Sequence, residues 1–215
     1  SDNSPYDLFV MNIDGTSLIN LTDTAEIDER YPTWSPDGSQ LAFQRNADND
    51  FDLYAINGDG TNLRALTNND ADDLGPDWSP DGTQIVFHTD IWGAAEDYDI
   101  AVLDLSSLQV RRLTDDNATN SFPTWSPDGT LIAYNAINSA GTVNIFVMSG
   151  DGGGIRQLTH ATNRSAFPDW SPDGSEIVYQ NGPHETSAIY IIPAEGGTPR
   201  AISDAQSDFM PDWQP

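Results

Sequence analysis

The sequence contains no cysteine and no lysine, and its eight cations, all arginines, face 34 acidic residues for a formal net charge of −26. The absence of cysteine excludes disulfides and thiolate chemistry. The scarcity of positive charge argues against binding to nucleic acid or to an anionic membrane surface, because both need a basic patch. No apolar run approaches the roughly 18 residues of a membrane span, so membrane insertion is not expected.

Aromatic residues and aspartates are abundant instead. Six Trp, seven Tyr and eight Phe are too many for a disordered coil. Of the 34 acidic residues 28 are Asp, which favours turns more strongly than Glu does. We therefore interpret much of the negative charge as the result of a turn-rich architecture, with adaptation to salt or to divalent cations as the alternative.

One motif recurs along the whole chain. Trp-Ser-Pro-Asp-Gly occurs four times and a truncated Trp-Gln-Pro once, at spacings of 44, 47, 45 and 43 residues. These motifs begin at Trp34, Trp78, Trp125, Trp170 and Trp213. A second marker, Leu-Thr or finally Ile-Ser, runs in phase and begins at Leu21, Leu66, Leu113, Leu158 and Ile202. Two independent markers with one period establish an internal repeat of about 45 residues.

Each repeat has the pattern of four short strands. A proline two residues before the Trp opens the first strand, and Ser-Pro-Asp-Gly then forms a tight turn. An aliphatic–small–aromatic segment such as 41–43 is the second strand, and 53–56 is an example of the third. The fourth strand follows a turn, which is Asp-Gly in three of the repeats, and carries the Leu-Thr marker. This pattern predicts an all-β fold, a β-propeller with the Trp and other aromatic residues between blades, and a β-solenoid is the structural alternative.

We expect a single domain over residues 1–215 that forms a five-bladed propeller of four-stranded antiparallel blades. The fifth blade is incomplete and shared by the two termini. Whole repeats cover about 30–67, 74–114, 121–159 and 166–203, and the split repeat combines 1–22 with 208–215. No segment of the split repeat can supply its second strand. We expect upstream residues, a tightened three-stranded blade or a strand of another protomer to close this gap, and the last would give a self-assembling polymer.

At these motifs the sequence resembles the TolB-type propeller repeats, over essentially its whole length. The shared pattern is Pro-x-Trp-Ser-Pro-Asp-Gly, then segments of the type Ile-Ala-Phe and Ile-Tyr-Val-Met, then Asp-Gly and Leu-Thr. The resemblance implies a periplasmic or secreted module with a non-catalytic, protein-binding or scaffold role. The N-terminal domain and the partner-binding tail of TolB are not matched, so the resemblance does not imply the TolB pathway.

The sequence carries no hydrolase signature. Gly-x-Ser-x-Gly is absent, and the histidines at 88, 160 and 184 occupy different repeat positions, so neither a triad nor a metal cluster is expected. The repeats are also near-copies, whereas glycosidase carboxylates need dissimilar surroundings. We therefore predict that the protein is not an enzyme. The alternative is a carbohydrate-active hydrolase or a glycan-binding propeller, which two or three channel carboxylates with raised pKa values would favour.

An Asp-rich loop resembles the opening of an EF-hand. Its acidic residues are Asp48, Asp50 and Asp52, but the sixth position is Leu53 rather than Gly and a strand follows. No cofactor is therefore expected, apart from loosely bound Ca²⁺ at this loop or at the neighbouring group Asp70, Asp72 and Asp73.

The residues just before each repeat proline are the best candidates for a binding site. If the Pro-Trp strand is innermost, as in the TolB type, these residues surround one mouth of the central channel. Four of the five positions nearest the channel are large and apolar. They either close the tunnel by packing together or bind a protein or peptide partner inside a polar rim. The predicted partner-binding residues are Glu29, Arg30, Tyr31, Asp73, Leu74, Phe122, Phe167, Asp208, Phe209 and Met210.

Overall fold

The structure is a computed structural model that describes residues 5–47, 49–94, 96–116, 118–138, 140–160, 162, 164–183, 186–204 and 210–213. The described residues form β-strands, turns and bends without an α-helix. The strands are β1 (Phe9–Val10), β2 (Ile19–Asn20), β3 (Asp28–Trp34), β4 (Gln40–Asn46), β5 (Phe51–Asn57), β6 (Arg64–Ala65), β7 (Asp73–Trp78), β8 (Gln84–Thr89), β9 (Asp99–Asp104), β10 (Gln109–Arg112), β11 (Thr119–Trp125), β12 (Leu131–Ile137), β13 (Val143–Ser149), β14 (Arg156–Gln157), β15 (Ser165–Trp170), β16 (Glu176–Asn181), β17 (Ala188–Pro193) and β18 (Arg200–Ala201).

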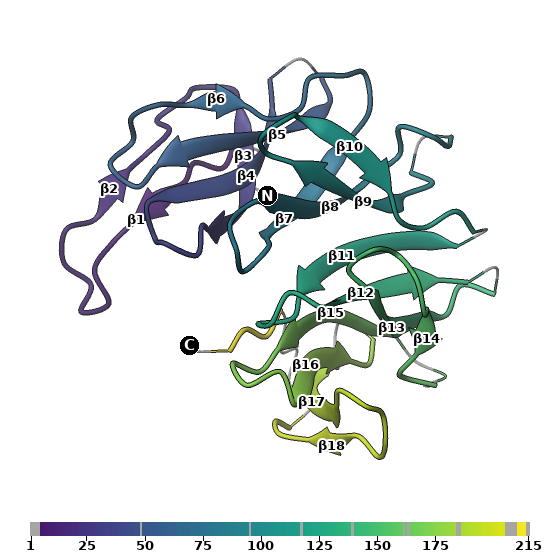
Figure 1. The fold of residues 1–215 in the computed structure, drawn as a ribbon. Coiled ribbons are helices and arrows are strands. Elements are labelled where there is room, and N and C mark those ends of the chain that lie inside the picture. Colours follow the sequence, from purple (N-terminus) through teal and green to yellow (C-terminus); the bar gives the residue numbers. More distant parts are fainter. Residues whose placement is uncertain are drawn as a thin grey trace.

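Four antiparallel sheets, each of four strands consecutive in sequence, follow one another around a centre (Figure 1). We call them the first blade (β3–β6), second blade (β7–β10), third blade (β11–β14) and fourth blade (β15–β18). A two-stranded sheet, β1–β2, is the described β-sheet of a partial blade. The predicted all-β propeller is thereby confirmed, with four complete blades and a partial one. In the described part of the chain, no helix has the length and apolar character needed to cross a bilayer.

The hydrophobic core lies between successive blades. Trp78 belongs to one buried cluster with Ala42 and Leu53 of the first blade and with Ile85 and Phe87 of its own blade. The equivalent Trp of the third and fourth blades have corresponding clusters with the blades that precede them. Each blade therefore stabilises its neighbour by burying apolar area that a single sheet would leave in water.

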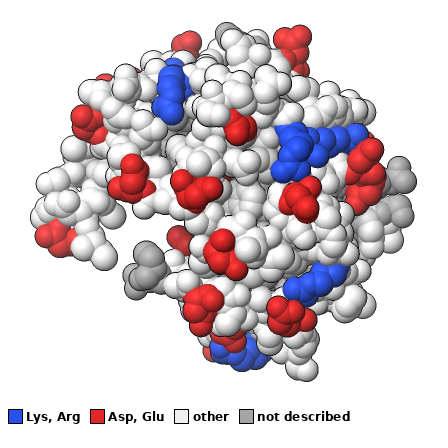
Figure 2. All heavy atoms as spheres, viewed as in Figure 1, with Lys and Arg blue, Asp and Glu red and all other residues white. Residues whose placement is uncertain are grey.

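The Ser-Pro-Asp-Gly turns use their aspartate as an internal acceptor. In the first blade, Asp37 Oδ1 accepts hydrogen bonds from Ser35 Oγ (2.7 Å) and from the Ser39 backbone N–H (3.0 Å). These bonds lower the pKa of Asp37 to about 2. The arrangement recurs at the same turn of the other complete blades, at Asp81, Asp128 and Asp173. Part of the acidity thus serves the turns, while Figure 2 shows carboxylates spread over the visible face.

The two ends of the chain pack against opposite sides of the array. Leu8 and Leu21, on either side of the β1–β2 hairpin, form a buried cluster with Leu41 and Phe43 of the first blade. At the other end, the Trp213 backbone N–H donates to Asp169 Oδ2 of the fourth blade at 2.9 Å. No described strand of the first or partial blade contacts one of the fourth, so the described strands form an open ring.

Candidate functional site

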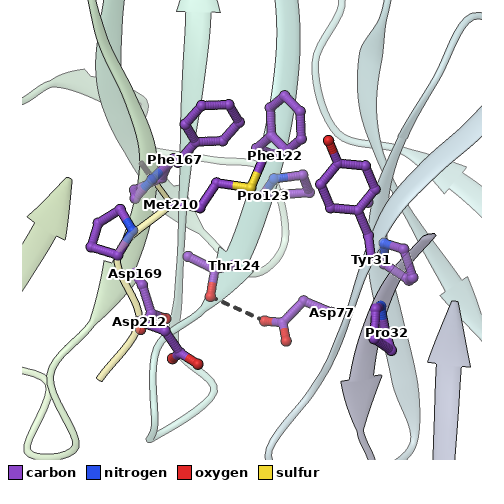
Figure 3. A pocket seen from close by; sticks show the side chains of 14 residues that line it. Tyr31, Pro32, Asp77, Phe122, Pro123, Thr124, Phe167, Asp169, Met210 and Asp212 are labelled. Carbon is purple, nitrogen blue, oxygen red and sulfur yellow. Dashed lines mark hydrogen bonds between the residues drawn. The ribbon is translucent and has the colours of Figure 1, made fainter. Parts of the chain in front are cut away.

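The residue before each repeat proline has a left-handed backbone. The φ angles at these five positions are +52° (Tyr31), +57° (Gly75), +51° (Phe122), +56° (Phe167) and +44° (Met210). In each complete blade the pairing of the first two strands shifts register here, which marks a β-bulge. The bulge interrupts the alternation of the innermost strand and directs the side chain at this position to the centre of the ring (Figure 3).

The four large side chains at these positions line one mouth of the channel, around a cavity of about 260 Å³. Phe122 lies centrally among them. Its ring centroid is 5.7 Å from that of Tyr31 and 4.5 Å from that of Phe167, both in edge-to-face orientation. Figure 3 shows Met210 beside these rings, and the five repeat prolines line the same cavity. The aromatic residues thus contact one another in part, yet a cavity remains open between them.

Polar side chains form the floor of this cavity. They come from the position between Pro and Trp, and Asp77, Thr124, Asp169 and Asp212 all line the cavity below the rings. Asp77 accepts hydrogen bonds from Thr33 Oγ1 (3.3 Å), Thr124 Oγ1 (3.2 Å) and the Trp125 backbone N–H (2.7 Å). Asp169 accepts the equivalent bond from Trp213 N–H. Both carboxylates therefore connect the innermost strands of successive repeats.

The floor carboxyls are easily protonated. Burial raises the pKa of Asp77 to about 6, although its three hydrogen bonds act in the opposite direction. Burial, together with the nearby carboxyl of Asp212, raises the pKa of Asp169 to about 7, although the hydrogen bond from Trp213 N–H acts in the opposite direction. None of the described residues that line the cavity is cationic. Two of the floor carboxyls therefore change charge between pH 5 and 8.

A neutral histidine supports the mouth from behind. Burial lowers the pKa of His88 to about 3, so its imidazole is uncharged at neutral pH. The Phe122 backbone N–H donates to His88 Nδ1 at 3.4 Å, and the two rings lie 5.1 Å apart. A Cβ added to Gly75 would come within 2.9 Å of His88 Cε1. The imidazole therefore occupies the space that a side chain at position 75 would need.

The structure separates the predicted site residues into groups. Tyr31, Phe122, Phe167 and Met210 line the cavity. Arg30 and Leu74 do not, and Arg30 instead pairs with Asp28 and lies over the ring of Tyr6. Asp208 and Phe209 lie outside the described residues.

Two of the predicted rim residues are interior, which corrects the expectation of an exposed acidic rim. Glu29 and Asp73 are each only 1% exposed. Thr24 Oγ1 donates to Glu29 Oε1 at 2.8 Å, and Asn69 Nδ2 donates to Asp73 Oδ2 at 2.8 Å. Burial raises the pKa of both carboxyls, that of Asp73 to about 6. They stabilise loops between blades and are inaccessible to a partner.

The floor carboxylates were missing from the predicted site. A signal for them existed, because Asp77, Asp169 and Asp212 all occupy the middle of the Pro-x-Trp motif. That this position faces the channel follows only from the structure, because the bulge interrupts the alternation of the strand.

The Asp-rich loop of the first blade is described only in part. Asp48 lies outside the described residues, Asp50 is half-buried, and buried Asp52 accepts a hydrogen bond from Thr67 Oγ1 at 3.1 Å. Among the residues that the structure does describe, no three His, Asp or Glu side chains are grouped as metal ligands. Calcium binding at this loop stays a prediction.

Solved structures with the same architecture include two TolB proteins. TolB from Acinetobacter baumannii shares 20% identity at a TM-score of 0.78, over 93% of this chain and 49% of its own. Putative TolB from Agrobacterium tumefaciens shares 22% identity at a TM-score of 0.78, over 96% and 85%. An oligogalacturonate lyase in complex with manganese gives 17% identity and a TM-score of 0.69, over 93% and 59%. This chain thus spans about half the length of the Acinetobacter protein, and at these identities the likeness shows the fold.

A search of curated proteins finds no match to the sequence. The family model described as the TolB beta propeller domain matches residues 9–101 and 94–215. These two matches cover nearly the whole chain, in agreement with the repeat motifs and with the blade architecture. The chain therefore belongs to the TolB beta propeller domain family.

Proposed function

We propose that this propeller is a non-catalytic, extracytoplasmic interaction module that binds a segment of a protein partner at the mouth of its central channel. The partner segment inserts an apolar side chain among Tyr31, Phe122, Phe167 and Met210. A neighbouring basic group of the segment approaches the floor carboxylates, since no described lining residue supplies a cation. The extracytoplasmic location and the protein-binding role follow the character of TolB-type propellers.

The observation that carries this proposal is the strain at the mouth. A left-handed backbone costs a non-glycine residue about 1–2 kcal/mol, more than it costs glycine. Gly75 shows that the bulge itself needs no side chain, yet the other four described repeats place large apolar residues there. Strained residues of this kind concentrate at functional sites, where binding compensates for their cost to stability.

The side chain of Tyr31 tests whether the mouth binds a partner or only closes the channel. Tyr31→Gly relieves backbone strain but loses the contact with Phe122, so we expect the free energy of unfolding to change by less than about 1 kcal/mol. Peptides selected against the wild-type protein from a displayed library are expected to bind the variant at least tenfold more weakly. Urea denaturation and fluorescence anisotropy measure the two quantities.

Leu108→Gly is the matched control, because Leu108 is exposed and also left-handed (φ +55°) but lies in the turn between β9 and β10. We expect this variant to bind the selected peptides like the wild type. If Tyr31→Gly instead lowers the free energy of unfolding by more than 2 kcal/mol and leaves peptide binding unchanged, the ring of side chains is a structural cap and the proposal is wrong.

A hydrolase is the second candidate, because two carboxyls with raised pKa values line the same cavity. Channel carboxyls with raised pKa values are the feature that we expect of a carbohydrate-active enzyme. The hydrogen bonds from Trp125 N–H and Trp213 N–H give both carboxyls a structural use, which favours the binding role. Turnover on a panel of oligosaccharides that Asp169→Asn abolishes would establish the enzyme, and no turnover on the panel supports the binding module.

A further inference from the structure

At three successive blade interfaces, a polar side chain of one blade binds the backbone of the mouth residue in the next. The acceptor is the last residue of the aliphatic–small–aromatic–polar segment on the second strand, and it is at most 4% exposed. The donor is the N–H of the left-handed residue, which the bulge takes out of the strand ladder and which therefore needs an acceptor elsewhere. The three pairs are Gln44 with Gly75 (3.0 Å), His88 with Phe122 (3.4 Å) and Asn135 with Phe167 (3.3 Å).

The acceptor of the second blade is an imidazole, whereas those of the first and third blades are amides. The mouth position of the same blade is Gly75, and a Cβ there would lie 2.9 Å from His88 Cε1 and 3.8 Å from Phe122 Cδ1. The imidazole and the Phe122 ring thus occupy the space of a fifth mouth side chain. As a result, Phe122 of the third blade contacts Tyr31 of the first blade across the second, with ring centroids 5.7 Å apart (Figure 3).

Aromatic contacts hold the imidazole in place. Its ring centroid lies 5.1 Å from that of Phe122 and 5.3 Å from that of Tyr98, the latter in edge-to-face orientation. The Tyr98 C=O also accepts from the Asn120 N–H at 2.8 Å, which connects it to the strand that carries Phe122. The ring of His88 is therefore fixed between two elements that lead to the mouth.

The direction of the hydrogen bond determines the tautomer of His88. The Phe122 N–H is the donor, so Nδ1 must carry a lone pair and the proton of the neutral ring is on Nε2. Burial lowers the pKa of His88 to about 3, which keeps the imidazole neutral and Nδ1 free to accept at neutral pH.

We propose that His88 is a positioning residue of the mouth, which as the Nε2–H tautomer accepts the Phe122 N–H and thereby holds the Phe122 ring over Gly75. This inference rests on the proposed function, because it assigns the shape of the same binding site to a residue behind it. His88 does not line the cavity, so it acts on a bound segment only through Phe122. Loss of the acceptor leaves the Phe122 N–H unpaired, which favours departure from the left-handed conformation.

Two variants of His88 separate its acceptor from its bulk. His88→Asn retains an acceptor, as Asn135 does for Phe167, but loses most of the ring. His88→Leu retains an apolar side chain but cannot accept. We expect the affinity for peptides selected against the wild-type protein to stay within about threefold in the Asn variant and to fall about tenfold or more in the Leu variant, by fluorescence anisotropy.

A role in packing alone predicts the reverse order of affinities, because the Asn variant loses more apolar contact than the Leu variant. Urea denaturation establishes that both variants are folded under the conditions of the binding assay. A greater loss of affinity in His88→Asn than in His88→Leu overturns the proposal.

The tautomer is measured on the wild-type protein and so does not depend on the folding of a variant. Long-range proton–nitrogen NMR correlation of the imidazole is expected to show an unprotonated Nδ1 and a protonated Nε2. Relative to the core amides of β12, the Phe122 amide is expected to exchange about tenfold faster in His88→Leu than in the wild type or His88→Asn. A protonated Nδ1, or equal relative exchange in all three proteins, contradicts the positioning role.

These readouts distinguish failure of this inference from failure of the proposed function. If no displayed peptide binds the wild-type protein, the interaction role is wrong, while the tautomer and the Phe122 exchange still decide whether His88 holds the mouth. If peptides bind both variants with wild-type affinity, the mouth binds without help from His88 and only this inference is wrong.

Discussion

Trp125→Ala is expected to lower the free energy of unfolding by about 3–5 kcal/mol, the usual cost of removing a buried large aromatic side chain. Trp125 is 7% exposed and packs with Val86 and Ile100 of the second blade and with Ile132 of its own. Its removal leaves a cavity at the contact that joins the two middle blades. Urea denaturation monitored by far-ultraviolet circular dichroism measures the change.

Trp34→Ala is the control within the same molecule, since the residue occupies the same repeat position but is 45% exposed. We expect it to cost about 1 kcal/mol, because much of its surface is already in water. Equal losses for the two variants would contradict the view that the partial blade leaves Trp34 uncovered.

The protein is expected to become more stable on mild acidification, by about 3 kcal/mol between pH 7.5 and pH 5. The folded-state pKa values of Asp73 and Asp77, about 6, and of Asp169, about 7, lie above the ordinary value of 3.8. His88 acts in the opposite direction, because burial lowers its pKa from 6.5 to about 3, but its effect is smaller than that of the three carboxyls together. In this range the folded chain binds more protons than the unfolded chain, so protonation favours folding. This contribution is fully present below pH 3.8 and is lost as the pH rises through 6 to 7.

Asp169→Asn should remove part of this pH dependence and raise the free energy of unfolding at pH 7.5. The turn carboxylates act in the opposite direction, but only at lower pH. The pKa values of Asp37 and Asp173 are about 2, so their contribution is present above pH 3.8 and is lost as the pH falls toward 2. Urea titrations at half-unit steps from pH 4.5 to 7.5 test this, and a steady decrease of stability with acidification would contradict it.

The fold could be predicted because each repeat contains the same short sequence motifs. Pro-x-Trp, Ser-Pro-Asp-Gly and Leu-Thr each determine local structure, and their common period places the strands in blades. The exposure of Trp34 did not follow from its motif, because the motif is the same as in the buried cases. Its exposure depends on the partial blade beside it, which is a property of the tertiary structure.

The site was predictable only in part, and the bulge explains why. The mouth residues Tyr31, Phe122, Phe167 and Met210 were identified from their place before proline. Glu29, two residues before Tyr31, was placed with them, but the structure buries it beside Thr24. A left-handed residue in the strand changes which face its neighbours occupy, and no sequence alternation reveals where that change occurs.

The open ring also determines where unfolding can begin. In a closed propeller every blade has two neighbours, whereas here the first and fourth blades each have one complete neighbour. The array then behaves like a short linear repeat protein, in which end units fray before middle ones. Amide exchange should therefore be slowest in β8 and β12 and faster in β4 and β16, although these four strands have nearly the same sequence pattern.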